Sequence, residues 1–382
     1  MTGRVDVIRE LAGIVPIEDE WRALALRRSN AFITPEWFRA FHENAASTTR
    51  PIVVAVHDAS GALLGVMPFV SASKPSSRQL RFAGASLGDY FHPAAAKEHE
   101  DEVAALATTA LARESDGWNM LVLHNVDRAA TWPRSLRTAA VRRTARLDDE
   151  PDVLPFADIS GGWEAFLASR SRNLRSQIGR KLRALESGHE VRFRRTETAE
   201  ELPVDMSAFF YLHHRRWQTR GGQSSLGATR VRAFHHDFAA AAFARGWLRL
   251  WFLEVDGRPV AAWYGWRLGE RYAYYSAGFE PDWADASVGL VLFAHTIRAA
   301  VDEGAAEYDM LLGNESYKSR FATGKREVGT VLITRSLHPG RAMAATEIGL
   351  RRAGRRLPDR ISDPLRSAAR MVITRLPTGR VI

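Results

Sequence analysis

The passage that most constrains the fold lies between residues 271 and 312. Residues 271–278 are rich in aromatic side chains, as strands are, and end at the turn cluster 280–282. After a loop of small residues, apolar side chains recur at helical spacing from Leu290 to Gly304, and a short apolar segment, 308–312, follows. This order predicts a strand, a loop, a helix and a second strand, which is a crossover unit of an α/β fold.

The loop before this helix, 285–289, contains no bulky polar side chain. Ser287 is placed to cap the helix, and Val288 and Gly289 would present backbone N–H groups at the positive end of the helix dipole. Such an end suits a phosphate or pyrophosphate, which Gly289 would allow to approach the backbone. Ser287, Val288 and Gly289 are therefore candidate donor-binding residues. The alternative is an ordinary crossover between two core strands.

The chain continues beyond the second strand with Tyr317 and Lys318. Open α/β sheets place ligands at the C-terminal ends of their strands, which makes Lys318 a candidate for contact with a reacting group. Asp309, at the edge of the strand, could orient Lys318, contribute to donor binding or cap a turn. The alternative is that Lys318 belongs to a basic surface loop together with Lys325 and Arg326.

His213, Arg216 and Trp217 share one face of a predicted helix because they are three and four residues apart. His213 could act as a general base or contact the acceptor, and Arg216 could bind an anionic part of the donor. In the alternative interpretation this face covers the core, with Trp217 buried and Arg216 extended beside it.

A polar run in the first half contains Asp89, Tyr90 and His92. We expect these three residues to contact the acceptor in a cleft between the two halves of the chain. Asp89 would attract an ammonium group, and His92 would assist removal of its proton. A turn that ends at Pro93 explains the same residues without a ligand.

Two α/β halves of similar order are expected, because a charged stretch with Pro and Gly occupies 145–160. The expected domains are 1–150 and 151–337, followed by a tail at 338–382. In the first half, helices and strands are predicted at 5–8, 17–26, 35–44, 52–57, 63–70, 101–113 and 120–124. In the second half they are predicted at 163–185, 191–194, 204–220, 230–245 and 248–268, ahead of the crossover unit.

Positive charge is concentrated in two places. Residues 341–382 contain ten arginines and three acidic residues, a net charge of +7, whereas the whole chain carries +9. Short amphipathic segments in this tail could lie on an anionic membrane surface, on RNA or on the domain itself. The helix expected at 163–185 also has a basic face, which could grip phosphates or simply be solvated.

Composition and missing motifs exclude several classes of protein. The 382 residues, 46% of them hydrophobic, suffice for two cores. The absence of cysteine excludes disulfides and thiolate chemistry, and no histidine spacing indicates a metal site. Walker, dinucleotide-binding and nucleophile-elbow motifs are absent. Because neither a signal peptide nor a membrane span is evident, we expect a soluble cytoplasmic protein.

Several motifs resemble those of the GNAT acyltransferases, in particular their Fem-related, double-GNAT branch, which includes acetyltransferase-like proteins of cellulose and exopolysaccharide biosynthesis. The matching segments are 31–37, 87–90, 212–217, 246–250 and 313–321, and they span most of residues 15–335. The resemblance implies two GNAT-like domains, each a mixed, mostly antiparallel sheet flanked by helices, plus a basic helical tail. The family's Gln/Arg-x-x-Gly-x-Gly/Ala loop is reduced here to Ser287-Val-Gly289.

The resemblance also implies the chemistry. Tyr317-Lys318 matches an aromatic–lysine motif whose lysine contacts the donor carbonyl or the leaving group, and His213 would join them as a catalytic residue. The expected reaction passes an acyl group, acetyl from acyl-CoA, to an amine of a small metabolite or sugar, without a tightly bound cofactor or metal. Two alternatives remain open: a Fem-type transferase with aminoacyl-tRNA as donor, and a non-catalytic partner in exopolysaccharide or envelope assembly whose tail contacts the inner membrane.

Overall fold

The structure is a computed structural model that describes residues 3–74, 77–113, 118, 120–139, 143–147, 151–218, 224–313 and 315–335. The chain divides into two compact units. Unit 1 contains the residues up to Asp152 and those from Glu327 onward, and unit 2 runs from Val153 to Arg326. The domain limits expected at 150 and 337 remain a proposal. The tail expected at 338–382 lies outside the described residues.

The sheet of unit 1 has the strand order β1-β2-β3-β4-β6-β14. The bounds of these strands are β1 (Val5–Ile8), β2 (Thr49–His57), β3 (Leu63–Lys74), β4 (Ser77–Phe82), β6 (Met120–Asp127) and β14 (Gly324–Arg335). Two shorter strands, β5 (Ala94–Ala95) and β7 (Arg143–Leu147), pair with β3 and β14. β4 and β6 are parallel, and the other paired strands of this unit are antiparallel.

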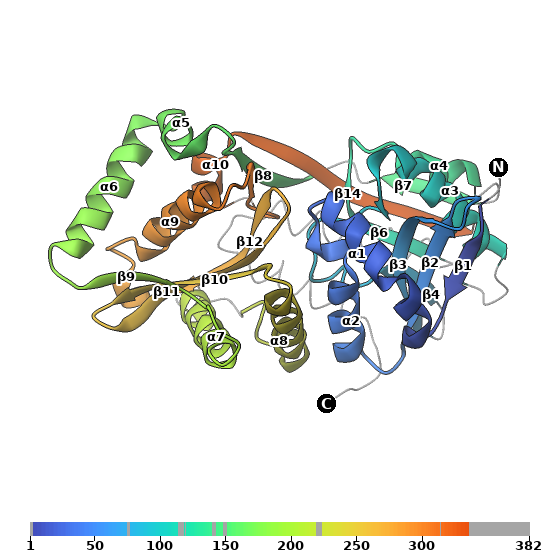
Figure 1. Cartoon of the computed structure of the whole chain (residues 1–382), viewed down its shortest axis with the longest axis horizontal. Helices are drawn as coiled ribbons and strands as arrows, with labels where there is room; N and C mark the ends of the chain where they lie inside the picture. The colour runs from blue at the N-terminus through green and yellow to red at the C-terminus, as the bar shows by residue number, and fades with distance from the viewer. Residues whose placement is uncertain are drawn as a thin grey trace. The chain divides into compact units, whose positions relative to one another are not determined.

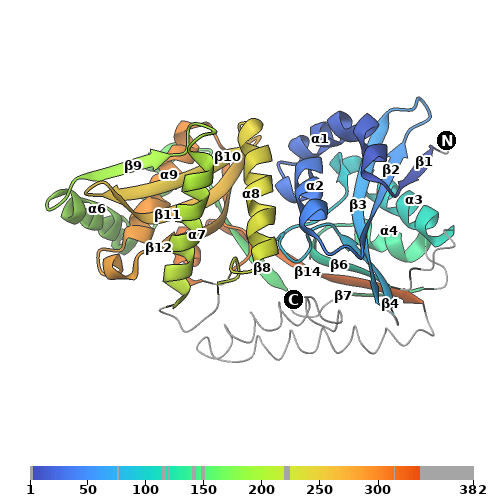
Figure 2. The same cartoon turned by 90° about the horizontal axis from the view of Figure 1, so that it is seen from below.

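Helices cover both faces of this sheet. In Figure 2, α1 (Glu18–Arg27) and α2 (Pro35–Asn44) lie on one face, and α3 (Glu100–Arg113) and α4 (Trp132–Ala139) lie on the other. α2 begins where the sequence predicts, because Thr34 accepts a hydrogen bond from the Trp37 N–H at 3.2 Å and Pro35 occupies the first helical position. The core of unit 1 is filled by large buried side chains, including those of Trp21, Trp37, Phe82 and Phe91.

The sheet of unit 2 has the strand order β8-β13-β12-β11-β10-β9. The bounds of its strands are β8 (Asp152–Asp158), β9 (Val191–Arg195), β10 (Leu248–Val255), β11 (Arg258–Leu268), β12 (Arg271–Phe279) and β13 (Glu307–Asp309). β12 and β13 are parallel. The predicted hairpin of β10 and β11 turns at Asp256-Gly257, where both φ angles are positive, as a tight hairpin turn requires.

Figure 1 shows α5 (Gly162–Ala168), α6 (Arg172–Glu186) and α9 (Val288–Asp302) on one face of this sheet. The other face carries α7 (Leu202–Gln218) and α8 (Thr229–Ala244). α7 approaches β12 so closely that a Cβ added at Gly278 would lie 2.2 Å from the backbone nitrogen of His213. Only glycine fits at this crossing, which fixes the position of the α7 residues that follow.

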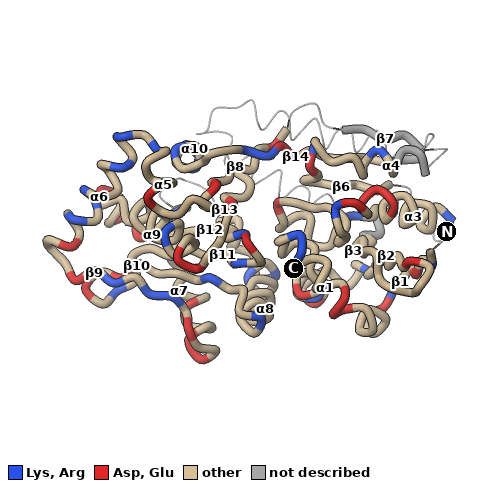
Figure 3. The backbone as a smooth tube through the Cα atoms, turned by 45° about the horizontal axis from the view of Figure 1, so that its top comes forward, with Lys and Arg blue, Asp and Glu red and all other residues tan. Residues whose placement is uncertain are grey.

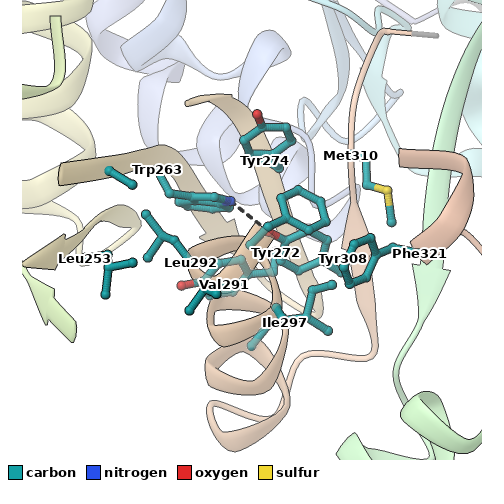
Figure 4. Close-up of a cluster of buried hydrophobic side chains, with 14 of the residues drawn as sticks. Leu253, Trp263, Tyr272, Tyr274, Val291, Leu292, Ile297, Tyr308, Met310 and Phe321 are labelled. Atoms are coloured by element: carbon teal, nitrogen blue, oxygen red, sulfur yellow. Dashed lines mark hydrogen bonds between the residues drawn. The ribbon is translucent and has the colours of Figure 1, made fainter. Parts of the chain in front are cut away.

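Aromatic side chains dominate the core between β12 and α9 (Figure 4). The Trp263 indole N–H donates to the Tyr308 hydroxyl at 2.8 Å, and that hydroxyl lies 2.8 Å from the Thr296 hydroxyl. At the same face, Trp251 donates to the Tyr272 hydroxyl at 2.7 Å. Buried polar atoms are costly without partners, so these bonds allow tyrosine and tryptophan to serve as core residues.

The α/β class and the crossover unit are confirmed, since β12, α9 and β13 follow in the predicted order. Two predictions and one alternative interpretation were wrong. The helix expected at 163–185 is two helices, because Ser171 caps α6 by accepting a hydrogen bond from the Leu174 N–H. The stretch 145–160, read as a linker, contains strands β7 and β8, and residues 325 and 326 belong to β14 rather than to a loop. No helix among the described residues combines the length and hydrophobicity that a bilayer crossing requires.

Candidate functional site

The two parallel strands of unit 2 pair over a short distance and then part. β12 and β13 are in register at three positions, and the last of these is Ala273 opposite Asp309. β12 continues beyond it to Phe279, whereas the chain after β13 turns at Leu311, which has a φ of 53°. The Asp309 carboxylate accepts a hydrogen bond from the Leu311 N–H at 2.9 Å and so supports this turn. The predicted donor-binding and catalytic residues lie on the elements around this opening.

The N-terminus of α9 differs in detail from the prediction. Ser287 occupies the N-cap position, but its φ of 60° is left-handed and its side chain makes no capping hydrogen bond. Val288 is fully buried, backbone included, whereas Gly289 is partly exposed. A Cβ added at Gly289 would lie 3.5 Å from the Phe279 ring, which is ordinary contact. The Leu290 N–H already donates to the Ser287 carbonyl oxygen at 2.9 Å, so the Gly289 N–H is the group at this helix end that an external acceptor could meet.

Lys318 lies on the short helix α10 (Ser316–Phe321) and is 4% exposed, so it is not the surface lysine of the alternative interpretation. Its ammonium group donates to the Leu312 carbonyl oxygen at 2.7 Å and lies 3.2 Å from the Glu315 carboxylate. It also sits 5.5 Å from the centre of the Tyr274 ring. The lysine is therefore held in one place by a carbonyl, a carboxylate and an aromatic face.

Two tyrosines and an arginine complete this cluster. The hydroxyl groups of Tyr317 and Tyr274 are 3.0 Å apart. Burial, together with the neighbouring Tyr274 and Glu315, raises the pKa of Tyr317 well above its usual value, so its proton is retained. Arg216 reaches the cluster from α7; it donates to the Ala277 carbonyl oxygen at 3.1 Å.

Arg216 also links the cluster to the start of α9. Its guanidinium lies 5.6 Å from the centre of the Phe279 ring, and the same ring is the nearest neighbour of Gly289. Although burial acts to lower it, the pKa of Arg216 is raised by Tyr274, Tyr317 and Glu315, so the arginine stays charged. The structure thus brings Arg216, Gly289, Tyr317 and Lys318 together in unit 2.

The sequence analysis did not single out Glu315 as a site residue, although it is the acidic member of the cluster. Its side chain is 41% exposed, and it precedes α10 at the N-cap position. Burial favours a higher pKa for this carboxyl, but the Lys318 charge, a hydrogen bond from the residue's own backbone N–H and the Arg216 charge outweigh it, and the pKa is lowered. A glutamate three residues before a lysine at a helix start was the available signal.

His213 has two partners inside the fold. Its Nε2 accepts a hydrogen bond from the Trp217 indole N–H at 3.0 Å, which leaves the proton on Nδ1, 2.9 Å from the Ser224 hydroxyl. Burial, followed by the charge of Arg216, lowers the pKa of His213 to about 3. Its role as a general base stays a prediction, and the geometry shows a neutral histidine that ties α7 to Ser224.

Asp89, Tyr90 and His92 lie in unit 1, and their contact with an acceptor stays a prediction. The Asn30 amide donates to the Tyr90 carbonyl oxygen and to His92 Nε2, both at 3.1 Å. His92 Nδ1 therefore carries the proton and donates to the Pro93 carbonyl oxygen at 2.8 Å. The buried imidazole is thus part of the turn that the alternative interpretation describes.

The predicted basic helix is α6, and its apolar side packs on the core of unit 2. Figure 3 shows its basic positions, and the exposed ones are Arg172, Arg175, Arg180 and Arg183. Arg170, which the sequence placed on the same face, instead donates to the carbonyl oxygens of Phe321 and Ala322 and so anchors α10. Among the described residues, no three His, Asp or Glu side chains gather as a metal site; the expected lack of a metal stays a prediction.

Comparison with known proteins bears on the fold of the chain. Residues 172–319 match the family model of the acetyltransferase (GNAT) domain. No curated protein sequence matches the chain. A crystal structure of FemX is similar with a TM-score of 0.60 at 12% identity, over 82% of this chain and 95% of FemX.

Two further structures are similar over 87% of this chain. The C-terminal domain of a putative lysylphosphatidylglycerol synthetase from Agrobacterium fabrum has a TM-score of 0.54 at 11% identity, with 95% of that chain covered. L-PGS from Bacillus licheniformis has a TM-score of 0.53 at 12% identity, with 96% of that chain covered. The predicted recognition is confirmed: the chain has a GNAT-superfamily acyltransferase fold of the Fem-like kind.

Proposed function

We propose that this protein is an N-acyltransferase that binds acyl-CoA in unit 2 and passes the acyl group, acetyl in the simplest case, to an amine. The uncapped N-terminus of α9 carries this proposal. It offers the Gly289 N–H and the positive end of a helix dipole to a pyrophosphate. Gly289 leaves room for the ligand beside the Phe279 ring, and the Arg216 guanidinium, 5.6 Å from the centre of that ring, adds a positive charge.

The reacting end of the donor would lie at Lys318. During acyl transfer the amine nitrogen bonds to the carbonyl carbon and the C–S bond breaks, so negative charge develops first on the carbonyl oxygen and then on sulfur. An ammonium group has three N–H donors, and the Leu312 carbonyl and the Glu315 carboxylate account for two of them. The third would serve the carbonyl oxygen. The Tyr317 hydroxyl, which keeps its proton, is the candidate to protonate the leaving thiolate, and the proton that the amine nitrogen loses would restore the hydroxyl, so that an amide and a thiol are released.

A second candidate function is supported by α6. Four exposed arginines on one helix suit a polyanion larger than coenzyme A, and an aminoacyl-tRNA would supply both the phosphates and the acyl ester. The short loop with a single glycine also departs from the family's donor loop. In this version Lys318 keeps its role at the carbonyl oxygen, and the leaving group is a ribose hydroxyl.

Binding measurements distinguish these functions. Coenzyme A is titrated into the whole protein by calorimetry, and aminoacylated tRNA is tested in parallel by filter binding at two salt concentrations. We expect saturable coenzyme A binding in the micromolar range and no specific tRNA binding. Tight tRNA binding without coenzyme A binding would replace the first function with the second. Absence of both would leave the non-catalytic partner. Since acyl-CoA is a cytoplasmic metabolite, we place the reaction in the cytoplasm.

A further inference from the structure

The carboxylate of Glu315 occupies an unusual place for a residue at the start of a helix. A side chain at the N-cap ordinarily accepts hydrogen bonds from the first helical N–H groups. Glu315 is the N-cap of α10, yet it makes no such bond and turns instead toward the Lys318 ammonium group, 3.2 Å away. The carboxylate has therefore been drawn away from the helix end by cations.

The space for this carboxylate exists because residue 313 has no side chain. Gly313 has a φ of 146°, and a Cβ added there would lie 2.0 Å from the Glu315 carboxylate and 2.5 Å from the Lys318 ammonium group. The backbone conformation requires glycine, and a Cβ here would push aside the ends of both side chains. Gly313 and Lys318 thus border a volume that one carboxylate fills.

The charges around this volume do not balance without an anion. Lys318 is almost fully buried and Arg216 is charged, while Asp309 is engaged with the Leu311 N–H and lies 3.8 Å from Arg271 and from Arg326. A buried cation that loses its counter-charge costs several kcal/mol. If Glu315 leaves, another anion must take its place.

Glu315 is also the member of the cluster that can leave. Its side chain is 41% exposed, against 5% for that of Lys318. Lys318 is further fixed by the Leu312 carbonyl, and Arg216 by the Ala277 carbonyl. A swing of Glu315 toward solvent would open the volume without moving either cation.

We propose that Lys318 and Gly313 form a carboxylate-binding site, which Glu315 fills in the free protein and which a carboxylate of the acyl acceptor fills during the reaction. The inference rests on the proposed function, because it names the class of acceptor: an amine that also bears a carboxylate. The group that fills the site in this structure is a carboxylate, which favours a carboxylate over a phosphate as its ligand.

The test uses Glu315→Ala in the full chain and no acyl donor. Thermal unfolding is followed with increasing sodium formate, with sodium chloride at equal ionic strength as reference and sodium phosphate as a third arm. We expect formate to raise the Tm of Glu315→Ala saturably, by roughly 3 °C at ten times its dissociation constant. Wild-type protein should show no shift beyond that in chloride, because Glu315 already fills the site.

The double variant Glu315→Ala/Lys318→Met is the matched control, and in it the formate effect should disappear. Equal shifts in formate and chloride, or a formate effect that survives in the double variant, would overturn the proposal. A larger effect of phosphate than of formate would also contradict it, since the ligand class would be wrong. If Glu315→Ala does not fold, Glu315→Ser is used with the line width of 13C-formate as the readout. The formate test contains no coenzyme A, so a negative result would not affect the proposal that unit 2 binds acyl-CoA. Likewise, a failure to bind coenzyme A would not affect the result of the formate test.

Discussion

Two helices hold corresponding places in the two units, and their first turns have opposite electrostatics. α3 lies in the chain between the parallel strands β4 and β6, as α9 lies between β12 and β13. The first turn of α3 contains Glu100, Asp101 and Glu102, whereas that of α9 contains no acidic residue and has no side-chain cap. Acidic side chains compensate the positive end of a helix dipole. In unit 1 the chain itself supplies the anion, whereas in unit 2 we propose that a ligand supplies it.

The raised pKa of Glu100 shows that a carboxylate at this helix start is unfavourable in its charged form. Its side chain is almost fully buried, and burial raises its pKa to about 7 although the Arg28 guanidinium is 2.7 Å away. The two units therefore share an arrangement of parallel strands and a connecting helix but differ in the charge at the start of that helix. This difference lies in a few residues at one helix end rather than in the strand order.

The largest effect expected is that of Lys318→Ala. If unit 2 holds the reacting carbonyl, loss of the ammonium group should lower kcat/KM about 1,000-fold, or about 4 kcal/mol. Acyl-CoA turnover with a panel of amines measures it, and circular dichroism checks the fold. Lys325→Ala, which removes an exposed lysine on β14, is the control and should keep full activity. Equal activity in the two variants would remove Lys318 from the mechanism.

A smaller effect is expected in unit 1, from Glu100→Gln. With a pKa of about 7 in the folded state and 4.5 as the ordinary value, the native protein holds a proton between these pH values that the unfolded chain releases. Stability should therefore fall as pH rises from about 4.5 to 7 and stay level above, by about 3 kcal/mol in all. The glutamine variant should lack this fall. Urea unfolding at pH 5 and pH 8 measures the free energy of unfolding of the wild-type protein and of Glu100→Gln. If it changes equally with pH in both proteins, Glu100 is not the group responsible.

A substitution can give the first turn of α9 an acidic residue, as the first turn of α3 has. Gly289→Asp should weaken coenzyme A binding about 30-fold, or about 2 kcal/mol, because a carboxylate would repel the phosphates. Gly289→Asn has nearly the same shape without the charge and serves as the control; a Cβ at this position meets nothing closer than 3.5 Å. Calorimetry gives both affinities. If the two variants bind alike, the helix end is not the phosphate site.

The smallest effect concerns Ser287. Its left-handed φ of 60° strains a residue that has a Cβ, and its side chain makes no cap. Ser287→Gly should therefore raise stability by about 1 kcal/mol. Thr34→Ala, which removes the working cap of α2, should lower it by a similar amount. Scanning calorimetry compares the two. A lower Tm in Ser287→Gly would show that the serine side chain is bonded after all.

Much of the fold could be predicted because local signals were strong. β1 and α2 have the predicted bounds, and the crossover unit lies where aromatic and helical periodicity placed it. β8 and β14 were missed because their partners, β13 and β6, are distant in sequence and their own residues are mixed in polarity. Pairing of this kind is a tertiary property that no local window contains.

The candidate site was predicted only in part, for a related reason. Lys318, Arg216 and Gly289 stood out as charged or glycine residues next to predicted element ends. The aromatic residues of 271–278 were interpreted only as the signal of a strand, although the hydroxyl and ring face of Tyr274 contact Tyr317 and Lys318. Whether an aromatic side chain fills a core or shapes a site depends on what another element brings against it.

Strand β14 has a consequence for the synthesis of the protein. The chain leaves unit 1 at Asp152 and returns to it at Glu327, so unit 2 is an insertion within unit 1. β6 therefore obtains its antiparallel neighbour, β14, only after the whole of unit 2 has been translated. Folding on the ribosome should run against the usual order, with the later-encoded unit complete while the N-terminal unit still lacks a strand.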